Sequence, residues 1–168
     1  MAKYEALRPS GRRPLLVLGI SDVVALEDEA AVKVEVKHVS AWGRWARDVA
    51  VPVDAQAVIS ALGEHFDIVW ASEWGHNAHT AFSEALGLPA EPWPFLPVQF
   101  DKLAAIRAYA RGLPWVWIDG DVVDLHPQAP EFGEGIVVRV DPGVGLSGLD
   151  VDALVDRVRG LPGAGGGA

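Results

Sequence analysis

The chain contains no cysteine among its 168 residues. This absence excludes a disulfide, a zinc site built on thiolates and a cysteine nucleophile. It also removes the residue type from which an oxidising or reducing compartment is usually inferred.

Basic residues are scarce. Lysine and arginine number 14 against 23 acidic residues, which gives a formal net charge of -9. Nucleic acid and anionic membrane surfaces are recognised by basic patches, so both are disfavoured as main partners. The acidity is otherwise typical of a protein kept in solution by its charge.

Long apolar runs are missing as well. Residues 1–13 include basic side chains, but no apolar segment with a small-residue cleavage site follows them, so no secretion signal is predicted. The apolar run at 14–20 is far too short to span a bilayer. We therefore expect a cytoplasmic protein with no membrane segment.

The most informative stretch that is present is the run from Leu15 to Ile20, which is apolar without alternation. Such a run is typical of a strand buried on both faces of a parallel sheet. Further strands are expected at 66–71, 114–118 and 135–140, separated by helices at 55–64, 77–86, 102–111 and 151–158. This order predicts an α/β fold, a three-layer αβα sandwich with a mostly parallel, Rossmann-like sheet.

The ends of these helices carry recognisable signals. Asp54, Asp101 and Asp150 precede helices as expected N-caps, and Gly87 follows one as an expected C-cap.

Residues 23–53 differ from the rest because they lack a helical period. Residues 31–39 alternate valine with charged residues, as in a half-exposed strand, and 49–53 is its expected partner. We interpret 23–53 as a small flap after the first strand. The predicted organisation is an arm at 1–13, one domain at 14–160 and a flexible glycine-rich tail at 161–168.

Polar side chains follow each buried strand. Ligands of open α/β sheets bind at the carboxyl ends of the strands, so these side chains are candidate site residues. Lys102 opens a helix, where a cation is mildly unfavourable unless it faces an anion. A solvated surface lysine is the simpler interpretation of Lys102 alone. The strand-end residues are Ser21, Asp22, Ser72, Glu73, Asp119 and Asp121.

Several motifs resemble the haloacid dehalogenase (HAD) superfamily, and in particular small HAD-like domains related to RNA-repair phosphatase modules. WASEW at 70–74 resembles the second motif, with Ser72 as the phosphoryl-binding hydroxyl. Lys102 in FDKLAAI resembles the third-motif lysine, and WIDGD at 117–121 the fourth motif. VDPGVGLSGLDVDAL at 140–154 resembles the closing segment. The resemblance covers about residues 14–160 and implies a HAD-like fold.

The first motif departs from the family pattern of Asp-x-Asp-Gly, since the same register reads Gly19-Ile20-Ser21-Asp22. In the family, the first aspartate attacks phosphorus and binds magnesium, and the second acts as general acid and base. Gly19 has no nucleophile, and the pKa of the Ser21 hydroxyl is too high for that proton transfer. The resemblance therefore implies a domain that has lost phosphatase catalysis and needs no cofactor.

An alternative keeps the activity. Magnesium prefers carboxylate oxygens. Of the two acids of the fourth motif, the first is present as Asp119. The second is replaced by Gly120, and Asp121 follows one residue later. Asp22 lies one position past the second aspartate, so strand alternation directs it elsewhere unless the backbone bulges. With such a bulge, Asp22, Asp119 and Asp121 would form a shifted magnesium-dependent phosphohydrolase site.

For the inactive form, we expect a binding or interaction module. A residual, metal-independent anion site would use Ser72 and Lys102, with a phosphorylated small molecule or a protein carboxylate as ligand. The competing arrangement is a closed pocket in which Lys102 pairs with Asp119. A role as an RNA-processing accessory rests on family analogy alone and is opposed by the charge.

Two histidines and several tryptophans are further candidates. His76 and His79 have a spacing that suits metal ligation, but no third ligand is evident, which favours surface histidines. Trp115 and Trp117 are expected to face the core together. Trp42, Trp74 and Trp93 would each pack in the core, or together wall a cleft or a partner-binding patch.

Overall fold

The computed structural model describes residues 13–27, 29–41, 45–97, 102–120 and 134–161. No helix within these ranges is long and apolar enough to cross a membrane. Three residues singled out in the sequence lie outside the described residues: the expected N-cap Asp101, the candidate site acid Asp121, and Trp42.

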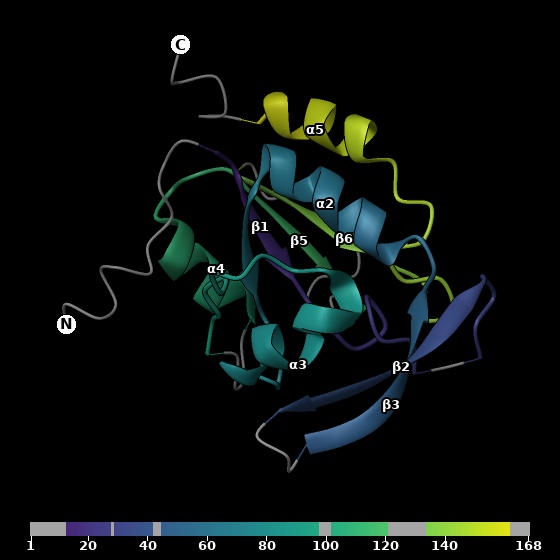
Figure 1. Ribbon diagram of the computed structural model, residues 1–168. Coiled ribbons are helices and arrows are strands. Elements are labelled where there is room, and N and C mark those ends of the chain that lie inside the picture. The colour runs from purple at the N-terminus through teal and green to yellow at the C-terminus, as the bar shows by residue number, and fades with distance from the viewer. Residues whose placement is uncertain (1–12, 28, 42–44, 98–101, 121–133, 162–168) are drawn as a thin grey trace.

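A four-stranded parallel sheet lies at the centre (Figure 1). Its order is β4 (Asp67–Trp70), β1 (Leu15–Leu18), β5 (Trp115–Asp119) and β6 (Gly135–Arg139). β1 is paired on both sides and its four residues are buried, as its unbroken apolar run predicts. The chain moves from β1 to β4 on one side and then to β5 on the other. The switch point of the sheet is therefore at the carboxyl ends of β1 and β5.

Helices cover both faces of this sheet, which confirms the predicted three-layer α/β architecture (Figure 1). Leu16 and Leu18 point into a core shared with α2 (Ala55–His65), α3 (Asn77–Leu86) and α5 (Val151–Arg159). Leu15 and Val17 point into a second core beneath α4 (Lys102–Ala110). The alternation of side chains along one strand thus supplies both cores.

The predicted flap contains a hairpin of β2 (Val34–Ala41) and β3 (Trp45–Pro52), which form a separate antiparallel sheet. Its alternation is as expected, but the face that carries Val34 and Val36 is not the buried one, and Val36 is 69% exposed. The buried valines are Val39, Val49 and Val51, on the face shared with the charged residues of β2. This face is buried because β3 supplies two of its valines, which the alternation within β2 alone does not reveal.

Helix caps follow the sequence signals in two of three cases. The Asp150 carboxylate accepts from the N–H of Ala153 at 3.0 Å, and Gly87 ends α3 with φ of 60°. Asp54 precedes α2, but the prediction that its side chain caps this helix is wrong. Its carboxylate accepts instead from the N–H of Gly148 at 2.9 Å, which ties the start of α2 to the loop before α5.

The proline-rich segment after α3 extends the sheet by one residue. Phe95 forms a parallel bridge with Trp70. The N–H of Trp70 donates to Pro94 at 2.9 Å, and the N–H of Leu96 donates to Trp70 at 2.8 Å. This segment therefore lies along part of the outer edge of β4.

Candidate functional site

The ends of β1 and β5 bring Gly19 beside Asp119. The N–H of Gly19 donates to the carbonyl of Ile118 at 3.0 Å, which continues the parallel ladder past β1. A Cβ atom at position 19 would lie 2.9 Å from both Cγ and Oδ1 of Asp119. The space that a side chain on residue 19 would occupy is therefore filled by the Asp119 carboxylate.

Lys102, Trp117 and Gly120 all donate to this carboxylate. Lys102 Nζ lies 2.7 Å from Oδ2, and Trp117 Nε1 donates to the same oxygen at 3.1 Å. The N–H of Gly120 donates to Oδ1 at 2.8 Å. The side chain of Asp119 is 3% exposed and that of Lys102 is 23% exposed. Lys102 is thus not a solvated surface lysine; the anion that it faces is Asp119.

The two tryptophans of β5 are buried on the α4 side of the sheet, as predicted. Their burial is part of the site, because Trp117 also supplies a hydrogen bond to Asp119. A buried indole N–H usually requires an acceptor, and here the acceptor is the candidate site carboxylate.

The chain turns sharply after Gly19. The N–H groups of Val23, Val24 and Ala25 all donate to the carbonyl of Ile20, and Asp22 adopts a left-handed conformation with φ of 64°. This is the backbone bulge on which a role for Asp22 depends. It places Asp22 Cβ 3.1 Å from where a Cβ on Gly120 would lie, so Asp22 is beside the end of β5.

Ser72 lies at the carboxyl end of β4 and is buried. Its hydroxyl oxygen accepts from the N–H of Trp74 at 3.2 Å, which closes a local turn. Lys102 and Ser72 thus have defined partners, Asp119 and Trp74, within the protein itself.

One residue at this edge was not identified from the sequence. Arg47 of β3 forms an ion pair with Glu27 at 2.9 Å, and its guanidinium lies 5.5 Å from the ring centroid of Trp74. Glu27 Oε1 also accepts from the Ser21 hydroxyl at 3.4 Å. These contacts join the hairpin to the loop after β1. The available signal was the position of Arg47 on the same hairpin face as Val49 and Val51.

A magnesium site does not fit the described residues. Asp119 is engaged by an ammonium, an indole and a backbone N–H, and a hard dication needs several carboxylate oxygens. Across the described ranges, no group of three or more histidine, aspartate or glutamate side chains is placed to hold a metal ion.

His79 is buried, so its interpretation as a surface histidine is wrong. Nε2 lies 2.7 Å from the carbonyl of Pro89 and donates to it. Nδ1 accepts from the N–H of Trp93 at 3.3 Å and from Trp70 Nε1 at 3.5 Å. Both ring nitrogens are used inside the fold, which leaves none for a metal, while His76 is exposed.

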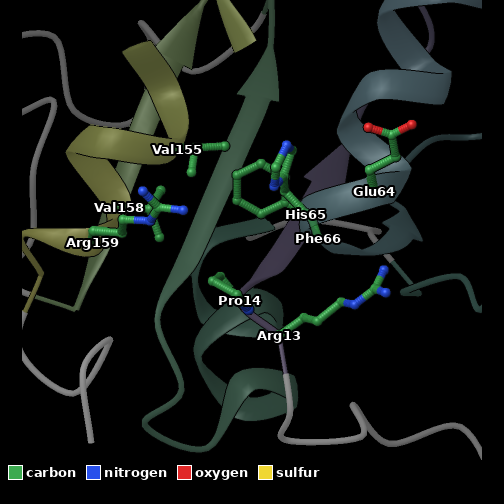
Figure 2. A pocket seen from close by; sticks show the side chains of 8 residues that line it. All are labelled: Arg13, Pro14, Glu64, His65, Phe66, Val155, Val158 and Arg159. Atoms are coloured by element: carbon green, nitrogen blue, oxygen red, sulfur yellow. The ribbon is translucent and has the colours of Figure 1, made fainter. Parts of the chain in front are cut away.

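Two adjoining cavities lie at the opposite, amino-terminal end of the sheet. The first, of about 260 Å³, lies between the ends of α2 and α5 (Figure 2). Arg13 extends toward the α2 side, and Arg159 lies across from it on α5. We call this the basic cavity; it is lined by Arg13, Pro14, Glu64, His65, Phe66, Val155, Val158 and Arg159.

The second, of about 400 Å³, shares Arg13 and Phe66 with the first. We call it the aromatic cavity; it is lined by Arg13, Leu15, Gly63, Phe66, Asp67, Ile68, Pro89, Trp93, Pro94 and Tyr109. Burial, together with the negative charge of Asp67, raises the pKa of Tyr109 to about 12. The Tyr109 hydroxyl is therefore neutral at ordinary pH.

Comparison of the chain with protein-family models and with curated proteins finds no match.

Proposed function

We propose that this chain is a HAD-like domain without phosphoryl-transfer activity that works as a binding module. The observation that supports this most directly is the filled space beside Gly19. In the HAD pattern this position carries the nucleophile, and here the Asp119 carboxylate lies 2.9 Å from where its Cβ would be.

The chemistry of the neighbouring groups supports the same proposal. Lys102 neutralises Asp119 and is not free to stabilise a transferring phosphoryl group. Ser21, at the place of the family's general acid, is a hydroxyl that donates to Glu27. Neither residue supplies the proton transfer that phosphoester hydrolysis requires.

The test is turnover of p-nitrophenyl phosphate with magnesium, using the full chain. We expect no rate above that of the buffer, and no difference between wild type and Asp119→Asn. An exposed carboxylate on α5 provides a matched control, Asp152→Asn. A rate that disappears in Asp22→Ala or Asp119→Asn, but not in the control, would contradict the proposal.

One observation favours the alternative of an active magnesium-dependent phosphohydrolase. The left-handed backbone at Asp22 brings this carboxylate to the end of β5, the strand that carries Asp119. The alternative also requires Asp121, which lies outside the described residues. Calorimetric titration with magnesium separates the two proposals. Binding that Asp22→Ala and Asp119→Asn both abolish would favour the enzyme, whereas absent or weak binding favours the binding module.

Residual anion binding at Ser72 and Lys102 stays a prediction. Such binding requires an anion to compete with Asp119 for Lys102, and the 2.7 Å pair opposes it. The measurement is thermal stability in increasing phosphate at fixed ionic strength, since a bound ligand raises the midpoint. An equal rise in wild type and Lys102→Ala would indicate a closed pocket and a module that binds through its outer surface. A cytoplasmic location likewise stays a prediction from the sequence.

A further inference from the structure

The aromatic cavity has the dimensions and lining of a ligand site. Its volume of about 400 Å³ falls in the range of small-molecule pockets. Three aromatic side chains, Phe66, Trp93 and Tyr109, line it together with two prolines. Among the described residues, its charged lining groups are the Asp67 carboxylate and the Arg13 guanidinium. Mostly apolar walls with few polar groups are typical of sites that orient an amphipathic ligand.

The electrostatics of the cavity favour a positive group. Three helices end around it: α2 contributes Gly63 in its last turn, α4 contributes Tyr109, and Pro89 follows the end of α3. The carboxyl ends of helices carry partial negative charge, which attracts cations. Asp67 adds a full negative charge to this wall, and the chain as a whole is strongly acidic.

Arg13 opposes this effect only in part. Its guanidinium donates to the carbonyl of Gly63 at 2.9 Å, so its charge is directed at the end of α2. Among the described lining residues, an anion would have only Arg13 as a cationic partner, against Asp67 and three helix ends. A cation gains from Asp67 and from the three helix ends.

We propose that the aromatic cavity binds a small organic ammonium ion with an apolar or aromatic body. The ammonium lies near Asp67, and the body packs against Phe66, Trp93 and Tyr109. Ionised carboxylates accept several hydrogen bonds, so Asp67 can serve a ligand in addition to its partners within the protein. The neutral Tyr109 hydroxyl offers a further acceptor for an ammonium N–H.

This site is independent of the proposed function. It lies at the amino-terminal end of the sheet, away from Gly19 and Asp119 at the carboxyl ends of β1 and β5. An active phosphatase edge would leave the ammonium site unaffected, and an empty cavity would leave the proposed loss of catalysis unaffected.

The experiment uses four probes that share a phenyl body and differ in charge. Binding of 2-phenylethylammonium, 2-phenylethanol, 3-phenylpropanoate and L-phenylalanine to the full chain is measured by calorimetry at neutral pH. We expect the ammonium compound to bind at least about tenfold more tightly than the alcohol, a difference of about 1.4 kcal/mol. The propanoate should bind more weakly than either, because Asp67 and the helix ends repel it.

Two variants locate the site. Asp67→Asn should weaken ammonium binding by at least about tenfold and bring it close to that of the alcohol. Trp93→Leu should weaken the binding of both compounds, because it removes a wall that both use. Asp152→Asn, on the exposed surface of α5, is the charge-matched control and should change nothing.

Several outcomes would overturn the proposal. One is equal binding of ammonium and alcohol, which would show a purely apolar cavity. Another is tighter binding of the propanoate, or of L-phenylalanine but not the amine, which would show that Arg13 dominates. The absence of saturable amine binding to wild type, or an undiminished affinity in a folded Asp67→Asn protein, would also reject it. Thermal unfolding of each variant establishes that it is folded.

Discussion

Gly19 and Asp119 occupy complementary space: the carboxylate lies where the side chain of any other residue at position 19 would begin. Asp119 is fixed there by Lys102, Trp117 and the N–H of Gly120, so it cannot move aside without losing these bonds. The observed position of the Asp119 carboxylate therefore requires a residue without a side chain at position 19.

Placing an aspartate at position 19, as in the HAD pattern, should not create a phosphatase. We expect Gly19→Asp to lower the free energy of unfolding by about 1–3 kcal/mol, the usual cost of overpacking, and to give no turnover. A second carboxylate beside Asp119 would also have to share a single lysine. Urea unfolding and the p-nitrophenyl phosphate assay measure the two effects.

A second glycine provides the matched control for this substitution. Gly63 lies in α2 with no atom within 4 Å of its would-be Cβ, so Gly63→Ala should stabilise the fold by about 0.5–1 kcal/mol. Gly19→Ala should destabilise, and Asp119→Ala in the same chain should relieve part of that effect. A Gly19→Ala protein as stable as wild type would show that Asp119 readily moves.

Breaking the buried ion pair from one side should be costly. Lys102→Met leaves the Asp119 carboxylate buried without its cation. We expect the free energy of unfolding to fall by about 3 kcal/mol, the lower end of the range for buried pairs, because Lys102 is partly exposed. The double variant Lys102→Met/Asp119→Asn should lose less than the sum of the single variants. A double-mutant cycle by chemical denaturation checks this, and strict additivity would mean that the pair contributes nothing.

Tyr109 should make the protein less stable in alkali. Its pKa is raised from 10.0 to about 12 by burial and by Asp67, so between these values the folded state keeps a proton that the unfolded state releases. This contribution to stability is complete below pH 10 and declines as the pH rises to about 12. Unfolding measured across this window should show the decline in wild type, and Tyr109→Phe should remove that component. Identical alkaline profiles would contradict the shift.

His79 should be a structural residue with no role in metal binding. We expect His79→Ala to lower the free energy of unfolding by about 1–3 kcal/mol, mainly because the buried Trp70 indole N–H loses its acceptor. The part-buried bonds to the N–H of Trp93 and to the Pro89 carbonyl are lost as well. The exposed His76→Ala is the control and should change stability by less than about 0.5 kcal/mol. A zinc-dependent rise in the unfolding midpoint that both substitutions remove would support metal ligation instead.

The sequence was sufficient for elements whose pattern is local. The unbroken run at Leu15 to Leu18 predicted a doubly covered strand, and Asp150 and Gly87 marked helix ends correctly. The prediction that the Asp54 side chain caps α2 was wrong because sequence spacing considers only nearby N–H groups. The carboxylate bonds instead to the distant N–H of Gly148. Long-range partners of this kind leave no trace in sequence spacing.

The same limit applies to the site. Spacing placed Asp119 and Lys102 at the sheet edge and offered their pairing as one of two arrangements, the other being an open anion site. It could not decide between the two, and it did not predict the left-handed backbone at Asp22. The spacing of His76 and His79 suited metal ligation, and the lack of a third ligand favoured surface histidines. His79 is instead buried and bonded to Pro89 and Trp93. Arg47 escaped notice because its partners, Glu27 and Trp74, lie in segments on either side of it in the chain.

The segment bridged to Trp70 also bears on the behaviour of the protein at high concentration. A parallel sheet with a bare outer strand offers unpaired N–H and carbonyl groups on which a second molecule can add a strand. Here Pro94 and Leu96 take up the outward N–H and carbonyl of Trp70. Pro94 has no N–H of its own to present to the next chain. The carboxyl end of the β4 edge is thereby a poor template for edge-to-edge aggregation.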